Sequence, residues 1–268
     1  LSSHPVAKGR VVLHFQPSEE NGRGAAAVLS DPRFIETGID RIFGFHNIPG
    51  APEGAVLVKN GIFASASVAL GLQLEGKACH ASEPESGMSP ASAMARLILH
   101  LQSLPGEMSN AIEGALVTSV YAGLGMPAAG ISPQHASLMF TLRAHDDEGL
   151  ETLKNAAVEK AQSISFSQGI SLDVNWSEGF PCTRNHHECV ALIREAAVES
   201  SPGVIAPERP FRWSEDFGHY TRRFPGAFFG IGAGFGAAPL HTREYLFPDE
   251  IIAPAIRIFL RLIALIHG

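Results

Sequence analysis

The sequence is short of sulfur and of the larger aromatic side chains. Its 268 residues include three cysteines, two tryptophans and three tyrosines. Cys79, Cys182 and Cys189 form no Cys-x-x-Cys pair, which argues against the common thiolate metal sites and redox motifs. An odd number of cysteines without a visible export signal is typical of a reducing compartment, so we expect a cytoplasmic protein.

Long apolar runs and an excess of positive charge are also missing. The charge-free stretch 119–142 contains Gly, Pro, Gln and His, which is incompatible with a membrane span. A net charge of −7 and a pI near 5.9 argue against a nucleic-acid partner. A chain that is 45% hydrophobic and 18% charged is an ordinary globular one, and its length allows one or two domains.

Two adjacent carboxylates, Glu19 and Glu20, are the first chemical signal. The apolar residues 11–15 predict a buried strand that ends at Pro17, and residues 24–36 predict a helix with a possible break at Asp31. Ligands usually bind at strand ends in α/β sheets. Two neighbouring carboxylates repel each other, which raises the pKa of one of them unless a cation lies close by. A metal ion beside the pair would relieve this repulsion: one Glu would bind the ion, and the other would stay free as a base. The alternative is a solvated turn that happens to carry two acids.

Two histidines follow other apolar runs. His46 follows a predicted strand at 41–45, and His241 follows the apolar run 227–232 and a Gly-rich loop. Either histidine alone would be read as polar surface. Together with a Glu from the acid pair, they make a plausible set of ligands for a zinc-like ion.

Residues 66–176 have a different periodicity from the α/β pattern on either side of them. Four alternating or apolar runs predict strands at 68–74, 116–121, 136–142 and 170–176. Two amphipathic helices separate them, one after Ser89 and one capped by Asp146 or Asp147. The resulting order, β-α-β-β-α-β, is the ferredoxin-like arrangement. We therefore expect an α/β domain (residues 1–65 and 177–268) with an inserted α+β domain (66–176).

Six motifs along the chain resemble, in order, the signatures of the M20 metallopeptidases. They are Phe-Gln-Pro-Ser-Glu-Glu-Asn (15–21), Phe-Gly-Phe-His-Asn-Ile-Pro (43–49), Gly-Lys-Ala-Cys-His-Ala-Ser-Glu-Pro (76–84), Thr-Leu-Arg-Ala (141–144), Ser-Glu-Asp-Phe (214–217) and Leu-His (240–241). The nearest resemblance is to the amidohydrolases that act on N-acyl amino acids, such as hippurate hydrolase and the auxin-conjugate hydrolases. This resemblance implies a catalytic α/β domain and an inserted lid or dimerisation domain.

The resemblance also implies roles for individual residues. Glu19 would be the general base, and Glu20, His46 and His241 would bind two divalent ions of the Zn, Mn or Co type. His80 would steady the oxyanion in the partner subunit of a homodimer, and Arg143 would pair with the carboxylate of the substrate. If the resemblance is set aside, His80 is interpreted as an ordinary turn residue and Arg143 as a solvated arginine on a strand.

The sequence departs from the family pattern in two places. Relatives carry an N-terminal βα segment with a Cys-Gly-His-Asp motif that supplies two more ligands, and no part of this sequence matches it. Gly130 stands where the family has a substrate-binding asparagine. Asp216 in the Ser-Glu-Asp-Phe motif would either orient a ligand histidine or cap a helix.

The sequence therefore leaves three hypotheses for the function of the chain. The first is metal-dependent hydrolysis of the amide bond of N-acyl amino acids, with a metal-activated water and Glu19 as base. The second is an incomplete, non-catalytic chain that folds and dimerises without turnover. A third, weaker alternative is a dipeptidase of the same superfamily.

Overall fold

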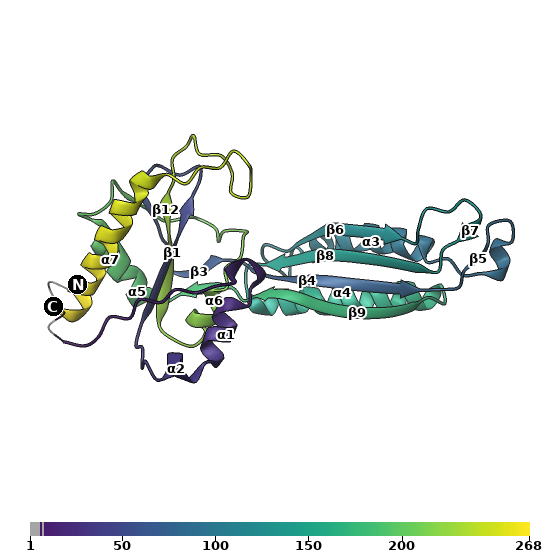
Figure 1. The fold of residues 1–268 in the computed structure, drawn as a ribbon, viewed down its shortest axis with the longest axis horizontal. Coiled ribbons are helices and arrows are strands. Elements are labelled where there is room, and N and C mark those ends of the chain that lie inside the picture. Colours follow the sequence, from purple (N-terminus) through teal and green to yellow (C-terminus); the bar gives the residue numbers. More distant parts are fainter. Residues whose placement is uncertain (1–5, 7) are drawn as a thin grey trace. The chain divides into compact units, whose positions relative to one another are not determined.

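The structure is a computed structural model that describes residue 6 and residues 8–268. The chain forms two compact units (Figure 1). Unit 1 contains the described residues up to Ala64 together with Thr183–Phe211 and Glu215–Gly268, and unit 2 contains Ser65–Cys182 and Arg212–Ser214.

Unit 1 is built on a four-stranded sheet with the strand order β1-β12-β2-β11. The strands β1 (Ile42–Ile48) and β12 (Gly226–Gly232) run parallel, with His46 opposite Gly230. The strands β2 (Val56–Leu57) and β11 (Val204–Ile205) complete it. The other elements of unit 1 are η1 (Glu19–Asn21), α1 (Gly24–Ser30), α2 (Pro32–Ile35), β3 (Gly61–Ala64), β10 (Thr183–Asn185), α5 (His187–Ala197), α6 (Gly218–Thr221), η3 (Asp249–Ile251) and α7 (Ile252–His267).

Alternation along β12 sends side chains to both faces of this sheet. Phe229 packs with the apolar faces of α5 and α7 in one cluster of buried residues. Phe228 points the other way and contacts the ring of Phe217 at a centroid distance of 4.9 Å. The sheet is therefore covered on both faces, and the segment Glu215–Phe217 lies on the face opposite α7.

The expected strand at residues 11–15 is wrong, because residues 11–18 have no regular secondary structure. Leu13 is 70% exposed and Phe15 is 89% exposed. A strand needs a neighbour to pair its N–H and C=O groups, and no strand of the described residues pairs with this segment. An apolar run predicts a strand only if the tertiary structure supplies that neighbour.

The other expectations for this unit differ mainly at element boundaries. The helix expected at 24–36 is divided into α1 and α2 at Asp31, whose carboxylate accepts a hydrogen bond from the backbone N of Arg33 at 2.9 Å. Strand β1 continues to Ile48, so His46 lies within the strand and not after it. Strand β2 is only two residues long.

Unit 2 has one four-stranded antiparallel sheet with the order β6-β8-β4-β9. Its elements follow one another as β4-α3-β6-β8-α4-β9, the β-α-β-β-α-β order that the periodicity predicts. Together with the short elements β5, η2 and β7, which lie between them, these are β4 (Ala66–Glu75), β5 (Cys79–His80), η2 (Pro84–Ser86), α3 (Ala91–Glu107), β6 (Leu116–Leu124), β7 (Ile131–Ser132), β8 (His135–Ala144), α4 (Asp147–Ser167) and β9 (Ser171–Phe180). A lid function for this unit stays a prediction.

The core of unit 2 lies between its sheet and its two long helices. The apolar face of α3, from Ala93 to Leu104, is buried, and so is the apolar face of α4 from Leu150 to Ile164. Asp146 caps α4 by accepting a hydrogen bond from the backbone N of Gly149 at 2.8 Å. The two helices and the alternating residues of β8 therefore form one apolar layer.

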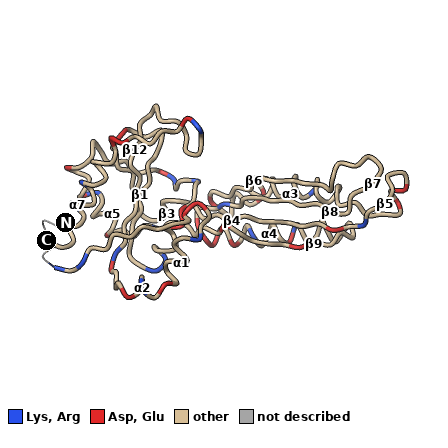
Figure 2. The backbone as a smooth tube through the Cα atoms, in the orientation of Figure 1, with Lys and Arg blue, Asp and Glu red and all other residues tan. Residues whose placement is uncertain are grey.

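Charged residues of both signs occur along both units (Figure 2). Within the described part of the chain, no helix has the length and apolar character needed to cross a bilayer.

Candidate metal centre

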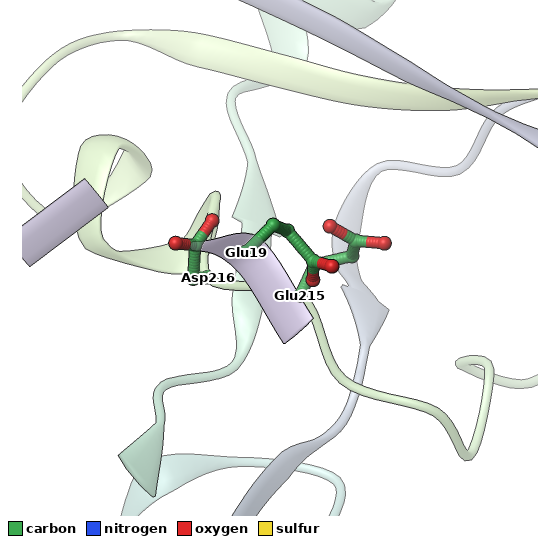
Figure 3. A group of neighbouring side chains, drawn as sticks. All are labelled: Glu19, Glu215 and Asp216. Carbon is green, nitrogen blue, oxygen red and sulfur yellow. The ribbon is translucent and has the colours of Figure 1, made fainter. Parts of the chain in front are cut away.

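Three acids from distant parts of unit 1 meet at the η1 turn. Glu19 lies in η1, and Glu215 and Asp216 lie just before α6. One carboxylate oxygen from each lies within 4.8 Å of the other two (Figure 3). Glu215 is 5% exposed and Asp216 is 2% exposed, whereas Glu19 is half-buried. Figure 3 shows Asp216 on one side of Glu19 and Glu215 on the other.

Burial of these acids changes their protonation. Burial raises the pKa of Glu215 strongly, and the neighbouring Glu19 carboxylate raises it further. Burial also raises the pKa of Glu19, and its hydrogen bond with Glu215 offsets part of that increase. Two carboxyl groups that share a hydrogen bond hold one proton between them unless a cation replaces it.

His46 joins this group from strand β1. Its Nε2 atom lies 3.7 Å from Oε1 of Glu215, and its Nδ1 atom lies 2.8 Å from the carbonyl oxygen of Asn47. A carbonyl oxygen can only accept, so in the neutral ring Nδ1 carries the proton and donates to it. The lone pair of Nε2 then faces the acids, which is the orientation of a metal-ligating histidine.

His241 lies beside the second acid of the pair. Its Nε2 atom lies 3.9 Å from Oε2 of Glu20, and both side chains are exposed. The loop that carries His241 is tied to the end of β1, because the side-chain amide of Asn47 donates a hydrogen bond to the hydroxyl of Tyr245. The backbone N of Gly50 also donates to the carbonyl of Gly234 at 3.1 Å. These contacts hold the His241 loop near the strand end that carries His46.

The backbone at two of these positions has an unusual conformation. Ser18, directly before Glu19, has φ of 60°, and His241 has φ of 63°. Residues other than glycine rarely adopt such angles, and where they do so the local structure is often functional. Both residues lie in the segments that present the acid pair and the second histidine.

The residues present fit a divalent cation. Glu19, Glu215 and Asp216 each place a carboxylate oxygen within 4.8 Å of the others, and the Nε2 atom of His46 lies 3.7 Å from Glu215, whereas Glu20 and His241 form a separate pair outside this group of described residues. Carboxylate and neutral imidazole are the ligands of zinc-like ions, and a cation would relieve the repulsion among the acids.

Asp216 contacts the start of α1. Its Oδ2 atom accepts hydrogen bonds from the backbone N of Ala25 at 2.8 Å and from the side-chain amide of Gln16 at 2.7 Å. Of its two expected roles, the structure gives the capping one, at the start of α1. The acid beside His46 is Glu215, which sequence reasoning missed although it stands in the same Ser-Glu-Asp-Phe motif.

The other two predicted site residues lie in unit 2. His80 is exposed in β5, which is separate from β4, and its Nδ1 atom lies 2.6 Å from the hydroxyl of Ser82. Arg143 donates from Nη1 to the carbonyl of Arg212 at 3.1 Å and to the hydroxyl of Ser214 at 2.9 Å. Burial lowers the pKa of Arg143.

Comparisons with known proteins bear on the whole chain. A family model described as Peptidase family M20/M25/M40 matches residues 1–265. The chain is 32% identical over 225 residues to an N-acetyl-L-cysteine deacetylase from Bacillus subtilis, a match that covers 84% of this chain and 53% of that protein. It is 28% identical over 256 residues to a hippurate hydrolase from Campylobacter jejuni, covering 95% of this chain and 66% of that protein. The chain thus spans about half to two thirds of the length of these relatives.

Solved structures share the fold. A dinuclear metal binding peptidase of the M20 family from Bacillus subtilis superposes with a TM-score of 0.74 at 24% identity, covering 94% of this chain and 64% of that one. An aminobenzoyl-glutamate utilization protein from Klebsiella pneumoniae gives 0.70 at 19% identity, covering 92% and 60%. From the match of the family model along almost all of its length, the chain belongs to peptidase family M20/M25/M40.

Proposed function

We propose that unit 1 carries the site of a metal-dependent amidohydrolase that cleaves the amide bond of N-acyl amino acids. The observation that carries this proposal is the meeting of Glu19 with Glu215 next to the Nε2 atom of His46, and of Glu20 with His241. A half-buried carboxylate beside a cluster of metal-ligand side chains is suited to take a proton from water.

In this proposal Glu20, His46 and His241 are ligands of a pair of divalent ions of the Zn, Mn or Co type. A bound divalent cation would polarise the amide carbonyl and lower the pKa of water. Glu19 accepts the proton of the attacking water on its carboxylate and passes it to the leaving amine. Glu215 stands against both Glu19 and His46, and it holds them in place.

The substrate class rests on the curated relatives. One is described as an N-acetyl-L-cysteine deacetylase and another as a hippurate hydrolase, and both names describe N-acyl amino acids as substrates. Arg143 would bind the carboxylate of such a substrate through its planar guanidinium. His80 would steady the oxyanion from the partner subunit.

A homodimer through unit 2 is part of the same proposal. Strand β6 forms one edge of the sheet in unit 2, and four of its apolar side chains are exposed. These are Leu116, Val120, Tyr121 and Leu124. An exposed apolar edge strand is suited to pair with a second copy, and sedimentation velocity on the chain and on a Tyr121→Lys variant tests this. We also expect a cytoplasmic location, in line with the three free cysteines.

The experiment is an activity panel of N-acetyl and N-benzoyl amino acids, with free dipeptides alongside, in the presence of Zn²⁺ or Mn²⁺. We expect hydrolysis of the N-acyl amino acids and a loss of about 10²–10⁴-fold in kcat for Glu19→Gln with metal still bound. Glu53→Gln, at an exposed position of unit 1, is the matched control and should keep the wild-type rate.

Other outcomes of this panel reject the proposal. Cleavage of dipeptides alone would favour the dipeptidase, and no hydrolysis by a metal-loaded chain would favour the non-catalytic alternative. A near-normal rate for Glu19→Gln would remove Glu19 as the base.

A further inference from the structure

The segment that carries Glu19 and Glu20 is a closed loop. We call residues 17–24 the acid loop. The backbone N of Gly24 donates to the carbonyl of Ser18 at 3.2 Å, and the backbone N of Gly22 donates to that of Glu19 at 2.8 Å. A Cβ atom at Gly24 would lie 2.0 Å from the carbonyl oxygen of Pro17. The two ends of the acid loop therefore touch, and only glycine allows this contact.

One carboxylate oxygen holds both ends of the acid loop. Gln16 directly precedes the loop and Ala25 directly follows it. Oδ2 of Asp216 accepts from Nε2 of Gln16 at 2.7 Å and from the backbone N of Ala25 at 2.8 Å. Hydrogen bonds to a charged acceptor are stronger than neutral ones, and Asp216 is almost fully buried.

A second layer fixes the side chain of Gln16. The hydroxyl of Tyr220 donates to Oε1 of Gln16 at 2.6 Å, and Nε2 of His14 lies 3.2 Å from that hydroxyl. Tyr220 is buried in α6, four residues after Asp216. The amide of Gln16 is therefore held at its oxygen and at its nitrogen by two residues of the same short segment.

We propose that Asp216 is a positioning residue that clamps the acid loop, so that Glu19 and Glu20 are held against Glu215 and His241. The proposal rests on the proposed function for its catalytic consequence, but the clamp itself does not depend on it. Because Glu215 and Asp216 are neighbours in the chain, the element that clamps the loop also supplies the acid that faces Glu19.

Proteolysis tests the clamp without any activity measurement. Arg23 is exposed within the acid loop, so trypsin can cut after it once the loop opens. We expect Asp216→Ala and Gln16→Ala to raise the rate of cleavage after Arg23 about tenfold or more, as the loss of a charge-assisted hydrogen bond would. Cleavage after Lys77, an exposed residue of unit 2, should stay unchanged.

A matched control is Asp146→Ala, which removes a carboxylate cap of the same kind in unit 2. It should leave cleavage after Arg23 at the wild-type rate. Unchanged cleavage in Gln16→Ala, whose substitution leaves Asp216 in place, would overturn the clamp even if Asp216→Ala failed to fold.

Kinetics separate positioning from stability. We expect Gln16→Ala and Tyr220→Phe to lower kcat with KM within about threefold, because a misplaced base affects the transition state more than substrate binding. An opened loop with unchanged kcat would overturn the positioning role. Absence of hydrolysis by the wild-type chain would reject the proposed function, and the cleavage rates would still decide on the clamp.

Discussion

The two units of this chain are stabilised in different ways. Unit 2 buries the apolar faces of two long helices against a regular antiparallel sheet. Unit 1 buries acidic side chains: among the described residues, Glu215 and Asp216 are the acids that are buried, and both belong to it. Buried acids cost stability unless they are paired or bind a cation. We therefore expect the acid cluster to lower the stability of metal-free unit 1, and unit 2 has no such cluster among its described residues.

The largest effect that we expect separates the two units. Leu97 is fully buried in α3, so Leu97→Ala should lower the free energy of unfolding of unit 2 by about 2–5 kcal/mol. Both tryptophans, Trp176 and Trp213, belong to unit 2, so their fluorescence during urea titration follows this unit.

Binding of Zn²⁺ to the folded Leu97→Ala variant should stay at the wild-type level, because the predicted ligands lie in unit 1. A variant that loses zinc affinity while its unit 1 is folded would contradict the division between an apolar unit and a site-bearing unit.

A smaller effect concerns the buried acid of unit 1. The pKa of Glu215 is raised from 4.5 to about 9 in the folded chain. A raised pKa contributes stability that is complete below pH 4.5 and is lost as the pH rises towards 9. In metal-free protein, Glu215→Gln should therefore melt at the wild-type temperature near pH 4.5 and on the order of a few degrees higher near pH 9.

Calorimetry on chelator-treated samples across this pH range measures the difference. Glu53→Gln, an exposed substitution in the same unit, should show no such pH dependence. A melting temperature for Glu215→Gln that stays below the wild-type value at high pH would mean that the Glu215 carboxylate is stabilised by a partner other than these acids.

The smallest effect belongs to the cap of α4. Asp146→Ala removes the acceptor for the backbone N of Gly149 and should cost about 1 kcal/mol of stability in unit 2. Tryptophan fluorescence measures this loss, and Asp146→Asn, which keeps an oxygen acceptor, should recover most of it. No recovery would mean that the charge of Asp146, and not the cap, stabilises the helix.

The same contrast explains what the sequence could predict. In unit 2 the buried faces recur at helical or strand spacing, so residues such as Leu97 and Leu138 are identified as core by periodicity alone. In unit 1 the candidate site depends on contacts such as that of His46 with Glu215, which are far apart along the chain. No local pattern contains such a contact, and this is why the role of Glu215 was missed.

The apolar segment 11–15 shows the opposite case, in which a local pattern predicts a strand that the structure does not form. Its composition is that of a strand, but no described strand pairs with it, and the side chains of Val12, Leu13 and Phe15 are exposed. The motifs around Glu19, His46 and His241 were recognisable because their order along the chain matches a family. Their distances from one another needed the structure.

The central claim is that Glu20, His46 and His241 bind a pair of divalent cations in unit 1. Calorimetric titration of Zn²⁺ into the metal-free chain tests it most directly, with His46→Ala and His241→Ala as the test variants and His187→Ala, an exposed histidine of α5, as the control. We expect each test variant to weaken zinc binding at least about tenfold, since even an outer partner of a metal ligand is worth that much, and the control to bind like the wild type. Equal affinity in all four proteins would contradict the account.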